Sequence, residues 1–153
     1  MATAALVVGG IALTRHPAPA AESASTSASA SDTTEADKKL CTEVAPALAD
    51  SDRVTNAFVK IGDPGTPERD AALPKFIDDT KDWVNRAQKA LDAHPDAQGY
   101  LRRSLQRYLD DFRLLVDGLR PGKLKPYNEN AYSDSNVAYN GPLNVCNSVG
   151  VKW

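Results

Sequence analysis

The sequence has little of what most enzymes use for catalysis. It contains only two histidines, His16 and His94, among 153 residues. It also lacks a G-x-S-x-G nucleophile motif, a phosphate-binding glycine loop and any spacing typical of metal ligands. His94 stands directly before Pro95, where an interaction with carbonyls at a helix C-terminus is its simplest role. These absences predict that the protein is not an enzyme and holds no cofactor.

Acidic clusters are the remaining source of a metal site, because helix bundles hold metals between carboxylates on facing helices. The clusters occur in FIDDTKDW (76–83) and YLDDF (108–112), and no E-x-x-H motif accompanies them. At helical spacing the acids project away from the apolar side chains beside them. We therefore expect these carboxylates to face solvent, and we predict no metal centre.

The sequence also lacks an excess of charge of one sign. Its 18 basic residues nearly balance its 20 acidic residues, which gives a formal net charge of −2. Arg107 can pair with Asp111, and Arg113 with Asp110 or Asp117, at helical distance. The arginines of residues 102–120 therefore indicate a mixed solvated face. A nucleic acid is not an expected partner.

No apolar run is long enough to span a bilayer, which takes about 20 residues. The first thirteen residues, MATAALVVGGIAL, match the length of a signal-peptide core, and Ala18-Pro19-Ala20 has the form of a cleavage site. No basic residue precedes the run, however, and Arg15 follows it. Residues 1–20 are thus interpreted as a signal peptide or as the outer half of an anchor that starts upstream. Either interpretation places the rest outside the cytoplasm, secreted or membrane-anchored, with only this segment touching the membrane.

Small polar residues fill the next stretch. Residues 21–34 are rich in Ser, Ala and Thr and have no large apolar side chain. Such a segment buries too little surface to offset the entropy of ordering. We expect a flexible linker, a plain spacer rather than a glycosylated stalk, followed by an extracytoplasmic helical domain over residues 35–153.

Three amphipathic segments are the main feature of this domain. The apolar residues of 35–61, 67–91 and 96–119 recur at spacings of three and four. Gly62-Asp63-Pro64-Gly65 and Arg120-Pro121-Gly122 supply the turns. We expect a kink at Pro46 or two short helices meeting near Ser51, and a kink at Pro74 or a helix that begins near Ala71. The short connection after Leu91 predicts an antiparallel hairpin of the second and third helices.

The last segment gives a weaker helical signal. Val137, Ala138, Gly141, Val145 and Cys146 fall at helical spacing, but Gly141-Pro142 interrupts the pattern. We predict a short fourth helix, capped by Ser133 or Ser135. The fold class is therefore all-α, a three- to four-helix bundle with a tethered C-terminal segment.

Only two cysteines occur, Cys41 in the first helical segment and Cys146 in the last. An exported chain with two such cysteines most simply forms a disulfide between them. The alternatives are two buried free thiols, which need a reducing compartment, and a redox pair. The redox pair is disfavoured because the C-x-x-C spacing is absent.

The C-terminal segment is rich in tyrosine and asparagine, which are residues of adaptable recognition surfaces. A possible binding surface consists of Tyr127, Tyr132, Tyr139, Asn140 and Trp153. The alternative, which we favour, is that Tyr132, Tyr139 and Trp153 pack onto the bundle while the asparagines form turns.

Several stretches, including DPGTPERDAALPKF, HPDAQGYLRR, RYLDDFR and AYNGPLNVCNSVGVKW, resemble small exported or membrane-anchored proteins of actinobacteria. The resemblance covers residues 35–153 and supports export and a helical domain. It implies no activity. We expect an extracytoplasmic binding or structural domain of the cell envelope, with an unknown envelope protein or ligand as partner. The alternatives are a subunit of an envelope complex and, distantly, an enzyme without a recognisable motif.

Overall fold

The computed structural model describes the backbone of residues 22–153 and the side chains of residues 32–153. The predicted signal peptide or anchor of residues 1–20 lies outside this part. Four helices and no strand make up the described chain: α1 (Glu22–Val59), α2 (Pro67–Ala93), α3 (Tyr100–Gly118) and α4 (Pro126–Ser148). The predicted all-α fold with a fourth helix is therefore confirmed. α4 begins at Pro126, however, so neither Ser133 nor Ser135 caps it as predicted.

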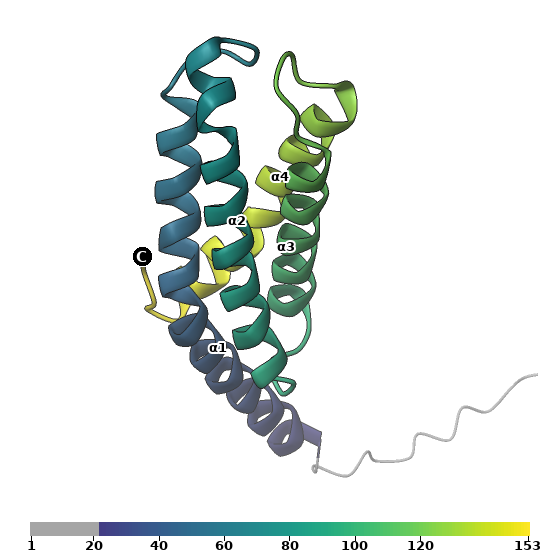
Figure 1. The fold of residues 1–153 in the computed structure, drawn as a ribbon. Coiled ribbons are helices and arrows are strands. Elements are labelled where there is room, and N and C mark those ends of the chain that lie inside the picture. The colour runs from purple at the N-terminus through teal and green to yellow at the C-terminus, as the bar shows by residue number, and fades with distance from the viewer. Residues whose placement is uncertain (1–21) are drawn as a thin grey trace, which may run out of the picture.

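The helices alternate in direction, so each packs against its neighbour in sequence. Figure 1 shows α1, α2 and α3 side by side, with the turn after α1 and the turn after α3 at the same end of the bundle. α4 packs mainly along α3 and then crosses behind α2 towards α1. The predicted hairpin of α2 and α3 is present, and α4 closes the fourth side.

The structure differs from the sequence prediction at the N-terminal end of α1. Residues 22–34, expected to be a flexible linker, continue the helix that follows them. Alanine is the best helix former and serine is tolerated, so the segment extends a helix that is already nucleated. Pro46 lies inside α1 without dividing it. In Figure 1 the N-terminal part of α1 tilts away from the rest, as expected where a proline removes a backbone donor.

Local signals decide where α2 and α3 begin. α2 starts at Pro67, after Thr66 in the N-cap position, and contains Pro74. The helix therefore does not begin near Ala71. α3 starts later than residue 96, because Gly99 precedes it with a φ of +78°, a backbone conformation that glycine adopts readily.

The core lies between the four helices and is centred on aromatic side chains. Trp83 has no exposed surface, and its ring packs at 4.9 Å from Phe112 and 5.7 Å from Tyr108 (centroid distances). Leucines and valines fill the space around them. The largest apolar side chains with at most 2% exposure besides Trp83 are Leu40, Val44, Leu48, Val84, Leu91, Leu101, Leu105, Leu109 and Phe112. Phe76 and Leu105, both placed on the predicted apolar stripes, are buried.

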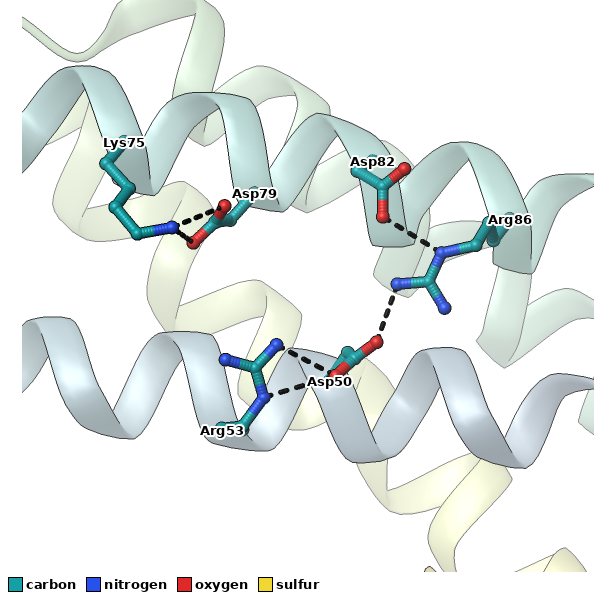
Figure 2. A network of polar contacts seen from close by, with 6 residues as sticks. All are labelled: Asp50, Arg53, Lys75, Asp79, Asp82 and Arg86. Atoms are coloured by element: carbon teal, nitrogen blue, oxygen red, sulfur yellow. Dashed lines mark hydrogen bonds and ion pairs between the residues drawn. The ribbon is translucent and has the colours of Figure 1, made fainter.

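The outer face between α1 and α2 carries a chain of ion pairs, drawn in Figure 2. Asp50 of α1 accepts hydrogen bonds from Arg53 and from Arg86 of α2, and Arg86 also pairs with Asp82. The bonds from Arg53 and Arg86 hold the pKa of the Asp50 carboxyl below its ordinary value. These charges are largely solvated, so each pair adds at most about 1 kcal/mol. Of these pairs, the one between Asp50 and Arg86 links α1 to α2.

The predicted charge pairs on α3 are formed in part. Arg113 lies 2.8 Å from Asp110, and Arg107 lies 3.6 Å from Asp111. Asp111 does not face solvent as predicted, because its side chain is only 13% exposed. α4 covers it and contributes Asp134, which also pairs with Arg107. Burial raises the pKa of the Asp111 carboxyl above its ordinary value.

The disulfide between Cys41 and Cys146 is present, which confirms the predicted pairing. Both cysteines are fully buried, and their Cα atoms lie 5.4 Å apart. The bond joins α1 to the C-terminal end of α4. It therefore tethers the helix whose own sequence signal is weakest.

A close approach of α3 and α4 explains why glycine interrupts the pattern of α4. A Cβ atom at Gly141 would lie 1.9 Å from Ser104 Oγ and 2.2 Å from Ser104 Cβ. The Ser104 hydroxyl is held in place, because it donates to the carbonyl oxygen of Tyr100 at 2.7 Å. The two helix backbones can approach this closely only because residue 141 has no side chain.

Gly141→Ala should therefore separate α3 from α4 and lower the free energy of unfolding by about 1–3 kcal/mol. Alanine has a higher helix propensity than glycine, which by itself would stabilise α4. The measured loss is therefore the cost of the clash with Ser104 minus this gain. Asn140→Ala, at the exposed neighbouring position, supplies the same type of gain without the clash and should be neutral or slightly stabilising. Urea unfolding of the three proteins checks this, and equal stability of Gly141→Ala and wild type would contradict the close approach.

Candidate functional site

A cavity at one end of the bundle is the best candidate for a functional site. Its lining residues come from the ends of α1 and α3 and from the first turns of α2 and α4. These helix ends lie at the top of Figure 1. The volume of the cavity is about 200 Å³. The lining residues are Thr55, Phe58, Val59, Arg69, Phe76, Leu115, Leu119, Leu124 and Tyr132. All four helices and the connection between α3 and α4 contribute to it.

Helical spacing brings the apolar part of the lining together. Thr55, Phe58 and Val59 occupy one side of the last turns of α1, and Leu115 and Leu119 lie four residues apart at the end of α3. Leu124 follows the turn Arg120-Pro121-Gly122. These side chains fill most of the space where the helix ends diverge, and the cavity is the part they leave open.

Two stacked aromatic rings form one wall of the cavity. The centroids of Phe58 and Phe76 are 4.0 Å apart and their planes differ by 11°. The guanidinium of Arg69 lies over Phe58, with its Cζ atom 4.6 Å from the ring centroid. Its Nη1 donates to the carbonyl oxygen of Gly62 at 2.5 Å. The ring and the carbonyl together hold the cation in one orientation.

The charge of Arg69 is not neutralised by a neighbouring acid. It forms no ion pair with any described residue, although Asp70 is adjacent in sequence. The Asp70 carboxylate instead accepts the backbone N–H of Gly122, at 3.0 and 2.9 Å from its two oxygens. This contact fixes the connection that carries Leu124. Arg69 is then the single charged side chain among the lining residues of the cavity.

A neutral polar group accompanies the cation. The hydroxyl oxygen of Thr55 is buried and has no hydrogen-bond partner among the described residues. Buried hydroxyls are normally satisfied by protein or by ordered water. The lining of the cavity is thus mostly apolar, with Arg69 as its one charged side chain and Thr55 and Tyr132 as its neutral polar residues.

The tyrosines and asparagine of the possible binding surface do not gather into one patch. Tyr132 lines the cavity, while Tyr127 is 51% exposed near the start of α4. Asn140 is exposed and its side chain donates to carbonyls of its own helix. Tyr139 and Trp153 pack onto the bundle instead.

Tyr139 and Trp153 meet at Asp52 of α1. The Tyr139 hydroxyl donates to Asp52 Oδ2 at 2.7 Å, and the indole N–H of Trp153 lies 3.1 Å from the same oxygen and 2.9 Å from the Tyr139 hydroxyl. Burial, and then the hydrogen bond to Asp52, raise the pKa of Tyr139. The phenol stays protonated and keeps donating. This cluster fastens the C-terminal residues to α1, at a point separate from the disulfide.

His94 does not line the cavity. Its imidazole Nε2 lies 2.6 Å from Glu43 Oε2, so the side chain does not bind the carbonyls at the helix C-terminus as predicted. Arg102 donates to the carbonyls of Leu91 and His94 instead. Among the described residues, no three His, Cys, Asp or Glu side chains converge as metal ligands.

Comparison with known proteins does not place the chain in a family. No family model, no curated protein and no solved structure matches it. Within the described residues, no helix combines the length and apolar character that crossing a membrane requires.

The sequence did not indicate Arg69, Phe58 or Leu124 as site residues. In the sequence, Arg69 stands between two acids, Glu68 and Asp70, that can pair with it. Phe58 and Leu124 have the spacing of ordinary core positions. One signal was available. Acids in the first turn of a helix are attracted to the positive end of the helix dipole and to backbone N–H groups. An arginine between such acids can therefore stay unpaired and available to another anion.

Proposed function

We propose that the protein is an extracytoplasmic helical domain of the cell envelope that binds a small, largely apolar ligand in the cavity at the end of its bundle. The cavity itself carries this proposal. Its volume of about 200 Å³ exceeds the roughly 150 Å³ of an engineered apolar cavity that takes up benzene. A few polar groups beside a mostly apolar lining are typical of ligand sites.

The disulfide supports the compartment. Thiols are kept reduced in the cytosol, whereas disulfides persist in oxidising compartments. Cys41 and Cys146 are the only cysteines, and both are in the bond. A helix that begins at residue 22 at one end of the bundle and a cavity at the other end also suit a domain held by its N-terminal segment. The cavity would then face away from the membrane.

The lining favours binding over catalysis. Arg69 is the single charged side chain among the lining residues, and no acid or histidine is among them as a proton-transfer partner. Acid–base catalysis needs such a group within hydrogen-bond reach of the reacting atoms. A ligand site needs only shape and a few polar contacts.

Nuclear magnetic resonance of the full chain with indole as a neutral probe tests the proposed site. We expect indole to shift amide resonances of residues around the cavity, including Phe58 and Leu119. Leu124→Trp, which fills the cavity from a loop position, should abolish these shifts. Val137→Trp, at a position 60% exposed on α4, should leave them intact.

Leu124→Ala guards against a folding defect in the filled variant, because it enlarges the cavity and should keep or strengthen the response. Circular dichroism confirms that each variant is helical. Shifts scattered over the surface, or shifts that persist in Leu124→Trp, would contradict the proposed site.

A further inference from the structure

We propose that the ligand of the cavity is a small organic acid, with its carboxylate on Arg69 and its apolar body between Phe58, Leu119 and Leu124. This inference rests on the proposed function and adds the chemical class of the ligand.

The charge of the lining indicates an anion. Arg69 is the one charged side chain among the described lining residues, and it forms no ion pair with them. A guanidinium has five N–H donors, and the protein uses one of them on Gly62. A carboxylate of a ligand would satisfy two further donors in a bidentate pair.

The orientation of Arg69 is fixed before any ligand arrives. Its guanidinium lies over Phe58, which stacks on Phe76, and the Gly62 carbonyl holds one end. Arginine prefers this combination of a stacked face and a free donor edge. Because the side chain is partly buried already, a ligand would lose less free energy in ordering it.

The volume of the cavity limits the size of the ligand's apolar group. This volume of about 200 Å³ leaves room for a single ring with a short side chain when compared with the roughly 150 Å³ that holds benzene. One cation matches one negative charge. The class is therefore a monocarboxylate with one compact apolar group, rather than a phosphate or a polyanion.

A pair of probes that differ only in charge tests this class. Calorimetric titration of the full chain should show 3-phenylpropanoate binding about tenfold or more tightly than its neutral amide, because a hydrogen bond to a charged group is the stronger one. Raising the salt concentration should weaken the binding of the acid and leave the binding of the amide unchanged. Arg69→Gln should remove the preference, so that the acid and the amide bind about equally. Arg69→Lys, which keeps the charge but loses the two-donor edge, should retain part of it.

The outcomes separate the two proposals. Equal binding of the acid and the amide to the wild type would overturn the acid class, while the indole response would still support the cavity as a site. A preference for the acid that persists in Arg69→Gln would also overturn it, since the arginine would then not be the group that binds the carboxylate. Self-association in light scattering that Leu124→Glu abolishes would overturn it too, because a second copy would occupy the cavity. Failure of both probes together with indole would defeat the proposed function itself.

Discussion

We expect the double variant Cys41→Ala/Cys146→Ala to lose about 4–5 kcal/mol of unfolding free energy relative to the oxidised protein. The two cysteines are 105 residues apart, and the chain-entropy model assigns about 4.7 kcal/mol at 25 °C to a closed loop of roughly 100 residues. Without the bond the unfolded chain gains the freedom that the loop removes. Urea unfolding of the two proteins measures the difference.

The loss should appear first in α4. This helix contains Gly141 and Pro142 and is joined to α1 by the disulfide and by the hydrogen bond from Tyr139 to Asp52. α2 and α3 keep their own apolar interface. Protease cleavage should therefore move to residues 127–147 on reduction, while the helical circular dichroism falls only modestly.

A reductant provides the control for this prediction. It should destabilise the wild type by about as much as the double substitution and should not affect the double variant. Free thiols at both positions in protein recovered from the extracytoplasmic side would contradict the bond and the compartment it supports.

Trp83→Ala should have the next largest effect, a loss of about 3–5 kcal/mol. The side chain is fully buried and packs edge-on against Phe112 and beside Tyr108. Alanine leaves a cavity that three helices cannot close, because Tyr108 is also held by a 2.6 Å hydrogen bond between its hydroxyl and Ser51. Denaturant unfolding followed by far-ultraviolet circular dichroism checks this, since tryptophan fluorescence would change with the substitution itself.

Trp83→Phe is the matched control. The indole N–H of Trp83 is buried without a hydrogen-bond partner among the described residues. Phenylalanine keeps most of the packing and removes that unsatisfied donor, whose burial costs about 1–3 kcal/mol. Its loss should therefore stay below about 2 kcal/mol. If Trp83→Phe lost as much unfolding free energy as Trp83→Ala, the indole N–H would have to be hydrogen-bonded, which would contradict this prediction.

The first three helices were predictable because their signals are local. The apolar residues of α2 recur at helical spacing, Thr66-Pro67 marks its start, and Arg120-Pro121-Gly122 ends the next helix, although its start after Gly99 was predicted at residue 96. The pairing of Cys41 with Cys146 was equally accessible, since a chain with two cysteines has one possible intramolecular bond. Burial of Phe76 and Leu105 follows from the same periodicity.

The candidate site was not predictable in this way. Phe58, Arg69 and Leu124 come from three separate segments, and nothing near any of them in sequence indicates that they share a cavity. Whether Arg69 is neutralised depends on Asp70, which turns to the backbone of Gly122, 52 residues away.

The sequence by itself determined the amphipathic parts of α1, α2 and α3, the turns that follow them and the covalent tether, because each depends on residue type and short-range spacing. It did not predict the N-terminal extension of α1 or the start of α4 at Pro126. Only the tertiary structure decided how α4 crosses the bundle, that Gly141 lies against Ser104, and that Asp111 is covered. It also decided that Trp153 and Tyr139 meet at Asp52 instead of forming an exposed patch. The physical reason is that these features are set by side chains meeting across long stretches of chain, where burial and charge pairing replace local preference.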